Sequence, residues 1–445
     1  MSTGKRDRSE GDLNQTDARR RWMADCLGGE AKRLLKEDET YFLRQSLSTP
    51  CLDVLESCHG SRISSIEGRS YLDFHGNSVH QVGYGHPKVV EAVKRQLDQL
   101  PFCPRRYTNM PAIELASRLA QLTPGDLGKS LFCPGGATAV GMALKLARVV
   151  TGRFKTVSWW DSFHGASLDT ISVGGEAHFR RGMGPLLPGA IHVPPPSEEG
   201  ETEADWLQSA EYVDYVMEHE GDVAAFVAEP VRTTAVLIPP KEYWIQIKEI
   251  CQNHKALLIF DEIPLCLGRT GRLFACEHTG VVPDVLCIGK GLGGGVFPLA
   301  AIVARNGLDL ASHTSLGHYT HEKTPLGCAA ALATLDVIRE EMLLDRAMRM
   351  EERARSRLRT LRSRHPIIES TTALGMLWGI RLVRTDGSPA LAESELLMYR
   401  CLEEGLSFKV SMGNTLVLMP PLTLTDDQFE ESMGILDAAL NDLTG

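Results

Sequence analysis

Lys290 and Asp261 are the two residues of this sequence whose types and surroundings are best suited to chemistry. Lys290 follows a short apolar run and precedes Gly-Leu-Gly-Gly-Gly, while Asp261 ends an earlier apolar run. A lysine amine can form an imine with an aldehyde cofactor, and pyridoxal phosphate then stores the electrons of a carbanion. The ring does so only while its nitrogen is protonated, which a buried carboxylate would ensure. Taken alone, a surface lysine in a Gly-rich loop and a strand-end aspartate are the commoner explanation.

Two further motifs would suit the phosphate and the ring of such a cofactor. A Gly-Gly-Ala-Thr motif at residues 135–138 opens a predicted helix, whose first backbone N–H groups can bind an anion. Phe163 begins a Phe-His-Gly motif, which places an aromatic ring before a tight turn, where it could stack on a cofactor. Each motif also has a plainer explanation, a turn before a helix in the first case and a core aromatic in the second.

Three short apolar runs predict the strands that must position these residues. The runs cover residues 223–228, 256–260 and 285–288, and they are too short for helices. Because they are apolar on both faces, they are typical of buried parallel strands. The amphipathic segment at residues 239–254 predicts the crossover helix between the first two strands, which gives a βαβ unit.

A charged residue follows each of these strands. Glu229 and Asp261 come directly after the first two, and Lys290 lies two residues beyond the third. In open α/β sheets, ligands bind outside the carboxyl ends of the strands. We therefore expect the three side chains to converge on one crevice.

The rest of the chain predicts flanking helices and a second lobe. Amphipathic patterns behind prolines predict helices that start near Pro87 and Pro111. From about residue 332 the pattern is that of one long charged helix ending near 364, followed by a smaller α+β lobe. The expected elements of that lobe are strands at 377–382 and 415–419 and a final helix with a capping box formed by Thr425 and Gln428.

These patterns divide the chain into three parts. Residues 1–75 form an N-terminal segment, whose first twenty residues we expect to be disordered or loosely docked and whose remainder packs with the small domain. Residues 76–331 form the large, cofactor-binding domain, and residues 332–445 form the C-terminal small domain. The predicted fold class is α/β with a second, α+β lobe.

Composition excludes several classes of function. The 445 residues carry a formal charge of −10 in mixed rather than blocky order, which argues against nucleic-acid binding and a polybasic membrane anchor. No apolar stretch approaches the length of a transmembrane helix. The 11 cysteines are scattered without a Cys-x-x-Cys pair, so neither a disulfide framework nor a metal site is indicated. We expect a cytoplasmic protein.

Taken in order, the motifs resemble those of the class-III pyridoxal-phosphate aminotransferase family over roughly residues 52–440. An ordered series of this length is highly specific. Along the chain it consists of Gly135-Gly136-Ala137-Thr138 with Ala143-Leu144-Lys145-Leu146-Ala147-Arg148, Phe163-His164-Gly165, Ala228-Glu229-Pro230, Asp261-Glu262, Gly268-Arg269-Thr270-Gly271, Pro283-Asp284, Gly289-Lys290-Gly291, and Thr320 near Thr324-Pro325.

The resemblance implies a fold, a cofactor and a role for each matched residue. The fold is that of a fold-type-I enzyme, with a mostly parallel sheet flanked by helices in the large domain. The cofactor is pyridoxal 5′-phosphate, and the assembly is a homodimer with active sites shared at the subunit interface. The implied roles are Lys290 as the lysine that holds the cofactor and moves protons, Asp261 on the pyridinium nitrogen, Phe163 stacked on the ring, Gly136 and Ala137 on the phosphate through their backbone, Thr320 on the phosphate of the partner's cofactor, and Glu229 in the cofactor-binding set.

Departures from the family pattern bear on the substrate. Members that handle amino-acid carboxylates often carry an arginine where this chain has Val417, and a guanidinium is the natural bidentate partner of a carboxylate. Its loss argues against an ordinary amino acid, unless another arginine substitutes. Pro264 stands where a glutamine is common, and Arg232-Thr233 stands in place of Gln-Gly. Arg232 is either a cation near the substrate or a solvated strand-end residue.

Arg106 is a second candidate for substrate binding. Arg106-Tyr107 resembles the Arg-Tyr of the family's ethanolamine-phosphate phospholyases, which eliminate a group instead of transaminating. Clustered arginines suit a phosphoryl or phosphonyl head better than a single carboxylate. Arginines on a solvent-facing loop are the commoner alternative.

Two stretches resemble a narrower branch of the family, the ammonia-lyases of 2-aminoethylphosphonate degradation. They are residues 74–87, Phe-His-Gly-Asn-Ser-Val-His-Gln-Val-Gly-Tyr-Gly-His-Pro, and residues 46–51, Ser-Leu-Ser-Thr-Pro-Cys. The likeness implies a lyase that converts (R)-1-hydroxy-2-aminoethylphosphonate, a small amine with a phosphonate head, to phosphonoacetaldehyde and ammonia. The alternatives are a transaminase for an ω-amine, aminophosphonate or amino acid, a phospholyase for phosphoethanolamine-like substrates, and a scaffolding homologue without catalysis.

Overall fold

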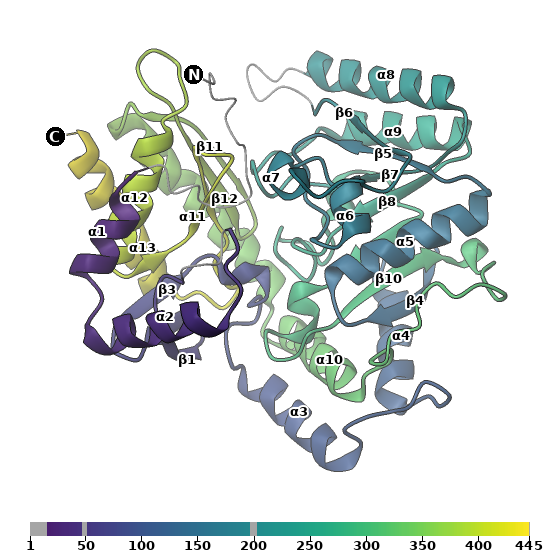
Figure 1. Cartoon of the computed structure of the whole chain (residues 1–445), viewed down its shortest axis with the longest axis horizontal. Helices are drawn as coiled ribbons and strands as arrows, with labels where there is room; N and C mark the ends of the chain where they lie inside the picture. The colour runs from purple at the N-terminus through teal and green to yellow at the C-terminus, as the bar shows by residue number, and fades with distance from the viewer. Residues whose placement is uncertain (1–15, 47–50, 196–202, 445) are drawn as a thin grey trace.

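A seven-stranded sheet forms the centre of the larger half of the molecule (Figure 1). The computed structural model describes residues 16–46, 51–195 and 203–444. The strand order is β4-β10-β9-β8-β7-β5-β6, and only β10 runs antiparallel to its neighbours. The strands are β4 (Leu127–Cys133), β5 (Lys155–Trp159), β6 (Ala190–Val193), β7 (Val223–Ala228), β8 (Leu257–Asp261), β9 (Val285–Ile288) and β10 (Ala300–Arg305).

The three strands predicted from apolar runs are confirmed. β7 and β9 have the predicted bounds, β8 lies one residue later than predicted, and all three are buried along their whole length. Val227 pairs with Ile259, and Ile259 pairs with Val285, so the strands are parallel and adjacent. The residues that follow their carboxyl ends are therefore brought to one edge of the sheet.

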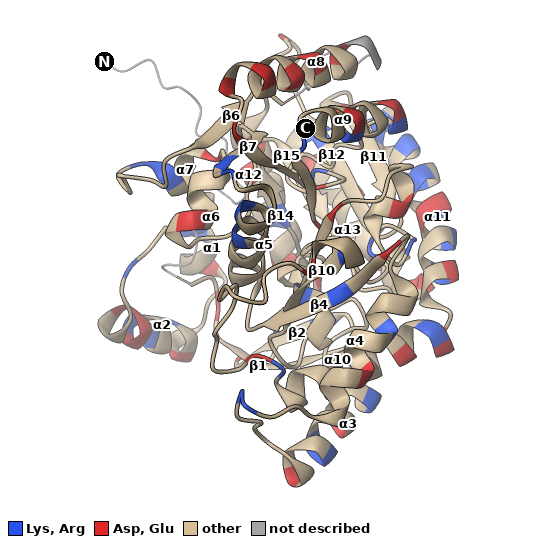
Figure 2. Ribbon diagram, turned by 90° about the vertical axis from the view of Figure 1, so that its right-hand side faces the viewer, with Lys and Arg blue, Asp and Glu red and all other residues tan. Residues whose placement is uncertain are grey.

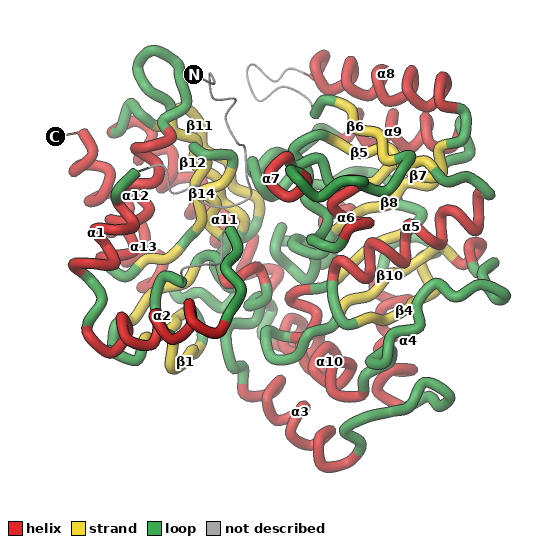
Figure 3. The backbone as a smooth tube through the Cα atoms, in the orientation of Figure 1, coloured by secondary structure: helices red, strands yellow, loops and turns green. Residues whose placement is uncertain are grey.

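Helices cover both faces of this sheet (Figure 3). Alternate strand residues pack in two separate apolar clusters, one with Val140 and Leu144 of α5 and the other with Trp244 and Ile247 of α9. The predicted crossover helix is α9. The helices of this half are α3 (Pro87–Gln99), α4 (Met110–Leu122), α5 (Gly136–Thr151), α6 (Leu168–Val173), α7 (Ala177–Arg180), α8 (Glu203–Glu220), α9 (Lys241–Asn253) and α10 (Pro325–Glu340), with short 3₁₀ turns η1 (Gly76–Ser78), η2 (Ala275–His278), η3 (Lys290–Gly293) and η4 (Asn306–Leu308).

The prediction of one long helix from 332 to 364 is wrong. The structure has two helices there, α10 and α11 (Leu343–Arg364), separated at Met342. Met342 has φ 49°, in the left-handed region that a continuous right-handed helix excludes. Because α10 packs against α3 and α4, we propose that the large domain extends to the α10–α11 break rather than to residue 331.

The smaller half combines both ends of the chain. Its antiparallel sheet, in the order β11-β12-β15-β14, packs with α11, α12 and α13. A second sheet, β1-β2-β3-β13, joins N-terminal strands to a C-terminal one, with Leu72 of β3 paired in parallel with Leu406 of β13. The elements are α1 (Ala18–Asp25), α2 (Gly29–Tyr41), β1 (Leu55–His59), β2 (Arg62–Ser65), β3 (Ser70–Asp73), β11 (Ile368–Leu374), β12 (Leu377–Leu382), α12 (Leu391–Glu403), β13 (Leu406–Ser407), β14 (Lys409–Ser411), β15 (Thr415–Leu418) and α13 (Asp426–Thr444).

The start of the described chain is docked rather than loose. Trp22 of α1 is 1% exposed and its ring lies 6.4 Å from that of Tyr399 in α12. The Thr16 N–H donates to the carboxylate of Glu395, at 2.8 Å. The part of this segment that the structure describes, from residue 16 onward, is therefore docked, and residues 1–15 lie outside the described residues, as do 47–50 of the second family-like stretch.

The capping box predicted for the last helix is confirmed. Thr425 N–H donates to the Gln428 side-chain oxygen at 3.0 Å, and Gln428 N–H donates to the Thr425 hydroxyl at 3.2 Å. This reciprocal pair satisfies two of the N–H groups that a helix start leaves without partners.

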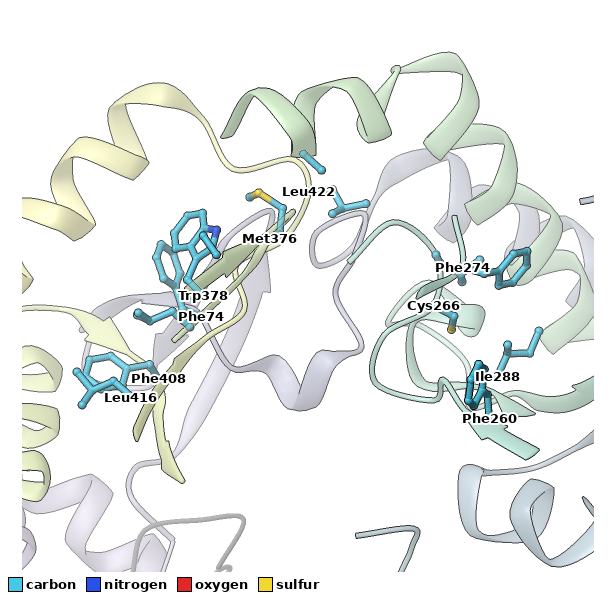
Figure 4. Close-up of a cluster of buried hydrophobic side chains, with 14 of the residues drawn as sticks. Phe74, Phe260, Cys266, Phe274, Ile288, Met376, Trp378, Phe408, Leu416 and Leu422 are labelled. Carbon is cyan, nitrogen blue, oxygen red and sulfur yellow. The ribbon is translucent and has the colours of Figure 1, made fainter. Parts of the chain in front are cut away.

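The two halves meet at a buried junction. The labelled core residues of Figure 4 fall into two groups, one around Trp378 and Phe74 and the other around Phe260 and Ile288. Arg269, fully buried between them, donates to the carbonyl of Met376 at 3.1 Å and also to that of Pro420. Since a buried guanidinium needs acceptors, these two carbonyls tie the loop after β8 to the small half.

Surface charge is mixed over the outer helices α9 and α11, whereas the charged residues of α8 are all Asp or Glu (Figure 2). Among the described residues, none of the helices combines the length and the apolar character that a membrane span requires.

Candidate active site

A cavity of about 200 Å³ lies at the carboxyl ends of β7, β8 and β9. It brings together six of the residues singled out from the sequence, including the three that follow the strands. Its lining consists of Gly136, Ala137, Phe163, His164, Gly165, Glu229, Thr233, Thr234, Asp261, Ile263, Pro264 and Lys290. Of these described lining residues, Lys290 is the one Lys or Arg.

Lys290 reaches the cavity from a turn that is held in an unusual conformation. Its φ is 45°, in the left-handed region, and it begins η3 directly after β9 and Gly289. Such a backbone costs a non-glycine residue about 1–2 kcal/mol, so the surrounding contacts must impose it. Gly291 supplies one of these contacts, because a Cβ there would lie 1.9 Å from the buried Gln81 Oε1.

Asp261 is held in place by a histidine. The imidazole of His164 donates from Nδ1 to Asp261 Oδ2 at 2.8 Å, and the Ile263 N–H donates to Oδ1 at 3.1 Å. Both side chains are buried. Two donors fix the orientation of the Asp261 carboxylate. No role was predicted for His164 from the sequence, although it lies next to Phe163.

The start of α5 offers donors for an anion. The helix has 16 residues, and its first N–H groups have no partner within it. The Phe-His-Gly loop packs tightly on this end, because a Cβ on Gly165 would lie 2.8 Å from that of Ala137. Phe163 adds an aromatic wall, 4.7 Å between ring centroids from Phe179. The start of α5, which can bind an anion, and the loop that carries Phe163 are therefore packed against each other.

Glu229 closes another side of the cavity. It is 5% exposed and accepts hydrogen bonds from Thr233, at 2.7 Å from the hydroxyl to Oε1 and 3.2 Å from the N–H to Oε2. Burial, and next the charge of Asp261, raise the pKa of the Glu229 carboxyl to about 7. The neighbouring Thr234 hydroxyl is 2% exposed and has no hydrogen-bond partner among the described residues.

Three of the predicted site residues lie outside this cavity. Arg106 and Thr320 are exposed on neighbouring loops, which are joined by a hydrogen bond from Asn109 Nδ2 to the Lys323 carbonyl at 2.9 Å. Arg232 is 1% exposed, and its guanidinium donates to the Asp161 carbonyl at 2.8 Å. It is therefore not a solvated residue, and it lies behind the wall formed by Thr233.

Comparison with known proteins gives consistent results along the whole chain. Residues 45–440 match the family model described as Aminotransferase class-III. The chain is 46% identical to the (R)-1-hydroxy-2-aminoethylphosphonate ammonia-lyase of Vibrio splendidus (strain 12B01), over 97% of this chain and 95% of that protein. It is 34% identical to the acetylornithine aminotransferase of Methanopyrus kandleri, over 86% and 92% of the two chains.

Solved structures with the same fold include two transaminase-type enzymes. The (S)-enantioselective omega-transaminase from Thermomicrobium roseum is similar with a TM-score of 0.86 and 27% identity, covering 93% of this chain and 99% of that one. A Bacillus anthracis aminotransferase is similar with a TM-score of 0.85 and 28% identity, covering 92% and 98%.

Proposed function

The chain belongs to the class-III aminotransferase family, and we propose that it is an ammonia-lyase that converts (R)-1-hydroxy-2-aminoethylphosphonate to phosphonoacetaldehyde and ammonia. The observation that carries the proposal is the 46% identity to a lyase of that name, which extends over nearly the full length of both chains. The enzyme has the fold-type-I architecture of its structural relatives.

Pyridoxal phosphate is the cofactor of this family, and the cavity fits it. The fit rests on the donors and acceptors present: free N–H groups at the start of α5, the Lys290 amine, and a buried Asp261 already oriented by His164. When bound, the cofactor supplies an electron sink for a carbanion next to the substrate nitrogen.

The residues of the chain would then act in two ways. Lys290 takes the proton from the carbon that bears the amine, since a lysine amine that lies within reach of that carbon can act as a general base. Asp261 keeps the ring nitrogen protonated, and Phe163 packs on the ring. The hydroxyl on the neighbouring carbon leaves, and hydrolysis of the product gives the aldehyde and ammonia. No amino acceptor is needed.

The apolar surroundings of Val417 support a substrate other than an ordinary amino acid. Val417 is fully buried in a cluster with Val231, Val236 and Met419. No guanidinium stands at that position to bind a carboxylate. Among the described residues, Glu229 has no ion pair and is bound by Thr233.

We propose that a homodimer completes the site. Lys290 is the one Lys or Arg on the described cavity wall, so a phosphonate dianion requires cations from elsewhere. Arg106 and Thr320 are exposed together on adjacent loops, where a second subunit could receive them. Arg232 would act indirectly, by supporting the Thr233 segment from behind.

We also propose a cytoplasmic location. All 11 cysteines are free thiols, the state that a reducing compartment maintains.

The test is a pair of incubations of purified enzyme with (R)-1-hydroxy-2-aminoethylphosphonate, with and without pyruvate. We expect one ammonia and one phosphonoacetaldehyde per substrate in both, and no turnover by the Lys290→Ala variant. Product that forms only with pyruvate, together with alanine, would replace the lyase by a transaminase. Inorganic phosphate released from phosphoethanolamine would point to a phospholyase.

A further inference from the structure

A buried carboxyl on the cavity wall is not used by the chemistry derived so far. Glu229 shares the cavity with Lys290, and among the described residues no cation pairs with it. Its Oε1 accepts a short bond from the Thr233 hydroxyl, while Oε2 receives only the longer bond from the Thr233 N–H. Each carboxyl oxygen has two lone-pair sites, so Oε2 keeps room for a proton.

The buried hydroxyl of Thr234, on the wall of the same cavity, indicates that a ligand binds there. Thr234 lines the same cavity, is 2% exposed, and has no hydrogen-bond partner among the described residues. A buried polar atom without a partner is unfavourable by about 1–3 kcal/mol, which a bound polar group would relieve. Glu229 and Thr234 thus form a wall with one proton donor and one free hydroxyl.

We propose that Glu229 is the acid that protonates the departing hydroxyl of the substrate, and that the Thr234 hydroxyl holds that oxygen. The inference rests on the lyase function proposed above. It assigns to this wall the half of the elimination that Lys290 does not perform.

The elimination combines two proton transfers with the cleavage of the C–O bond. Lys290 takes the proton of the C–H bond, and the electron pair of that bond becomes the second bond of a C=C. The C–O bond breaks, its electron pair leaves with the oxygen, and the proton of Glu229 completes a water molecule. Glu229 is left as a carboxylate and Lys290 as an ammonium, so one proton returned between them, directly or through water, restores both.

Other groups at the cavity are less suited to this role. The charge of Asp261 is needed at the ring, and the donors His164 and the Ile263 N–H hold the carboxylate in place for that role. Lys290 has already acted as the base. The environment of Glu229 favours the protonated acid, because burial and the charge of Asp261 both raise its pKa, to about 7.

The experiment compares two leaving groups in the Glu229→Gln variant. Hydroxide needs a proton in order to leave, whereas fluoride leaves as a stable anion. With the hydroxyl substrate we expect the variant to release ammonia about 10²–10³-fold more slowly than the native enzyme, the usual effect of losing a general acid. With 1-fluoro-2-aminoethylphosphonate we expect the two enzymes to differ by no more than about fivefold.

A second measurement follows only the removal of the C–H proton, the step assigned to Lys290. In D₂O, native enzyme and Glu229→Gln should exchange the C–H protons next to the amine of 2-aminoethylphosphonate at similar rates, as followed by NMR. This compound has no hydroxyl to lose. Retained exchange also establishes that the variant is folded and holds its cofactor.

Glu262→Gln provides a matched control. Glu262 is also fully buried, and burial also raises its pKa to about 7, but it is bound by the N–H groups of Ala275 and Cys276 and does not line the cavity. Its replacement should leave the ratio of hydroxyl to fluoride rates unchanged.

The possible outcomes distinguish a failure of the acid role of Glu229 from a failure of the lyase function. If native enzyme releases no ammonia without an acceptor, the lyase proposal fails and the acid role with it. The acid role alone is overturned if native enzyme is a lyase but Glu229→Gln slows ammonia release equally with the hydroxyl and the fluoro substrate, or slows it with neither. Unchanged rates with both substrates would assign both proton transfers to Lys290.

Discussion

Glu229 and Glu262 show how one fold gives two buried carboxyls different uses. Burial is the first cause of a pKa near 7 in both. Two backbone N–H groups, each at 2.6 Å, occupy Glu262 away from the cavity. In the described part of the chain, Glu229 is bound by Thr233 alone, at both carboxyl oxygens, and it lines the cavity. Placement, rather than acidity, decides which of the two can donate a proton to a substrate.

The rate of ammonia release should fall as pH rises above about 7. The acid must carry its proton, and above its pKa of about 7 the protonated fraction of Glu229 decreases tenfold per pH unit. The groups that face it are Asp261, His164 and Lys290 from the cavity and Thr233 from its own loop. A kcat profile between pH 5.5 and 9 checks this. In Glu229→Gln this falling limb should be gone, and a limb that persists there would belong to another group.

His164 should act as a positioning residue for Asp261. His164→Leu leaves a buried carboxylate oxygen without its donor, which is unfavourable by about 1–3 kcal/mol and should weaken cofactor binding about 5- to 150-fold. His164→Asn keeps an N–H donor near the place of Nδ1 and should recover most of the affinity. Titration of the cofactor-free protein with pyridoxal phosphate, followed by absorption, measures both. Equal losses in the two variants would mean that the ring shape, and not the hydrogen bond, is what matters.

At the scale of elements, the contact between η3 and the segment after η1 holds Lys290 in a turn with a left-handed φ. A Cβ on Gly291 would meet Gln81 at 1.9 Å, and the Gln81 side chain donates to the Cys266 carbonyl at 3.3 Å. Gly291→Ala should therefore displace η3, with an overpacking effect of about 1–3 kcal/mol on stability and a loss of activity. Thermal denaturation and turnover are the measurements.

The double variant Gln81→Ala, Gly291→Ala is the control for this contact. Removing the glutamine makes room for the methyl group, so activity should return toward that of Gln81→Ala alone. A double variant as impaired as Gly291→Ala would place the cause in the backbone of η3.

The sequence predicted three of the seven strands of the large sheet, β7, β8 and β9, which bring Glu229, Asp261 and Lys290 to the site. These strands are buried on both faces, so their apolar runs have clear bounds. It did not predict the α10–α11 break, because nothing in the residue type of Met342 indicates its left-handed φ. The hydrogen bond from His164 to Asp261 joins residues 97 positions apart, and only the finished sheet brings them together.

The residues that lie outside the cavity show a second limit of prediction from the sequence. Arg106 and Thr320 were matched to the family by motif, and both lie on exposed loops outside the cavity, where the homodimer proposed above would give them a role. The hydrogen bonds of Glu229 were missed for a local reason, because its partner Thr233 belongs to a segment that departs from the family pattern. Resemblance supplied the shared parts of the site, and the structure supplied the parts peculiar to this chain.

At the scale of the whole molecule, the junction between the two halves depends on one glycine. Gly375 has φ 57°, and a Cβ there would lie 2.3 Å from the Gly271 nitrogen and 2.4 Å from the Thr270 carbonyl carbon. Both are backbone atoms, which cannot move without displacing the chain around them. Gly375→Ala should lower the free energy of unfolding by about 2–4 kcal/mol, combining overpacking with a strained φ.

Gly387→Ala is the matched control for the junction. Gly387 also has a left-handed φ, 79°, but no atom lies within 4 Å of the added Cβ. This variant should lose only the conformational contribution, about 1 kcal/mol. Melting temperatures measured by differential scanning fluorimetry should therefore fall further for Gly375→Ala. Equal shifts would show that the junction tolerates a methyl group.

The parallel pairing of β3 with β13 also sets a schedule for biosynthesis. At about 5–20 residues per second, a ribosome takes roughly 17–67 s to make the roughly 330 residues between Leu72 and its partner Leu406. Through that interval the large domain can fold, while Trp22, Tyr71 and Leu72, all buried in the finished protein, wait for the chain that will cover them. The emerging amino-terminal segment thus exposes these apolar side chains until the C-terminal part of the chain is made, and pauses late in the message would prolong that exposure.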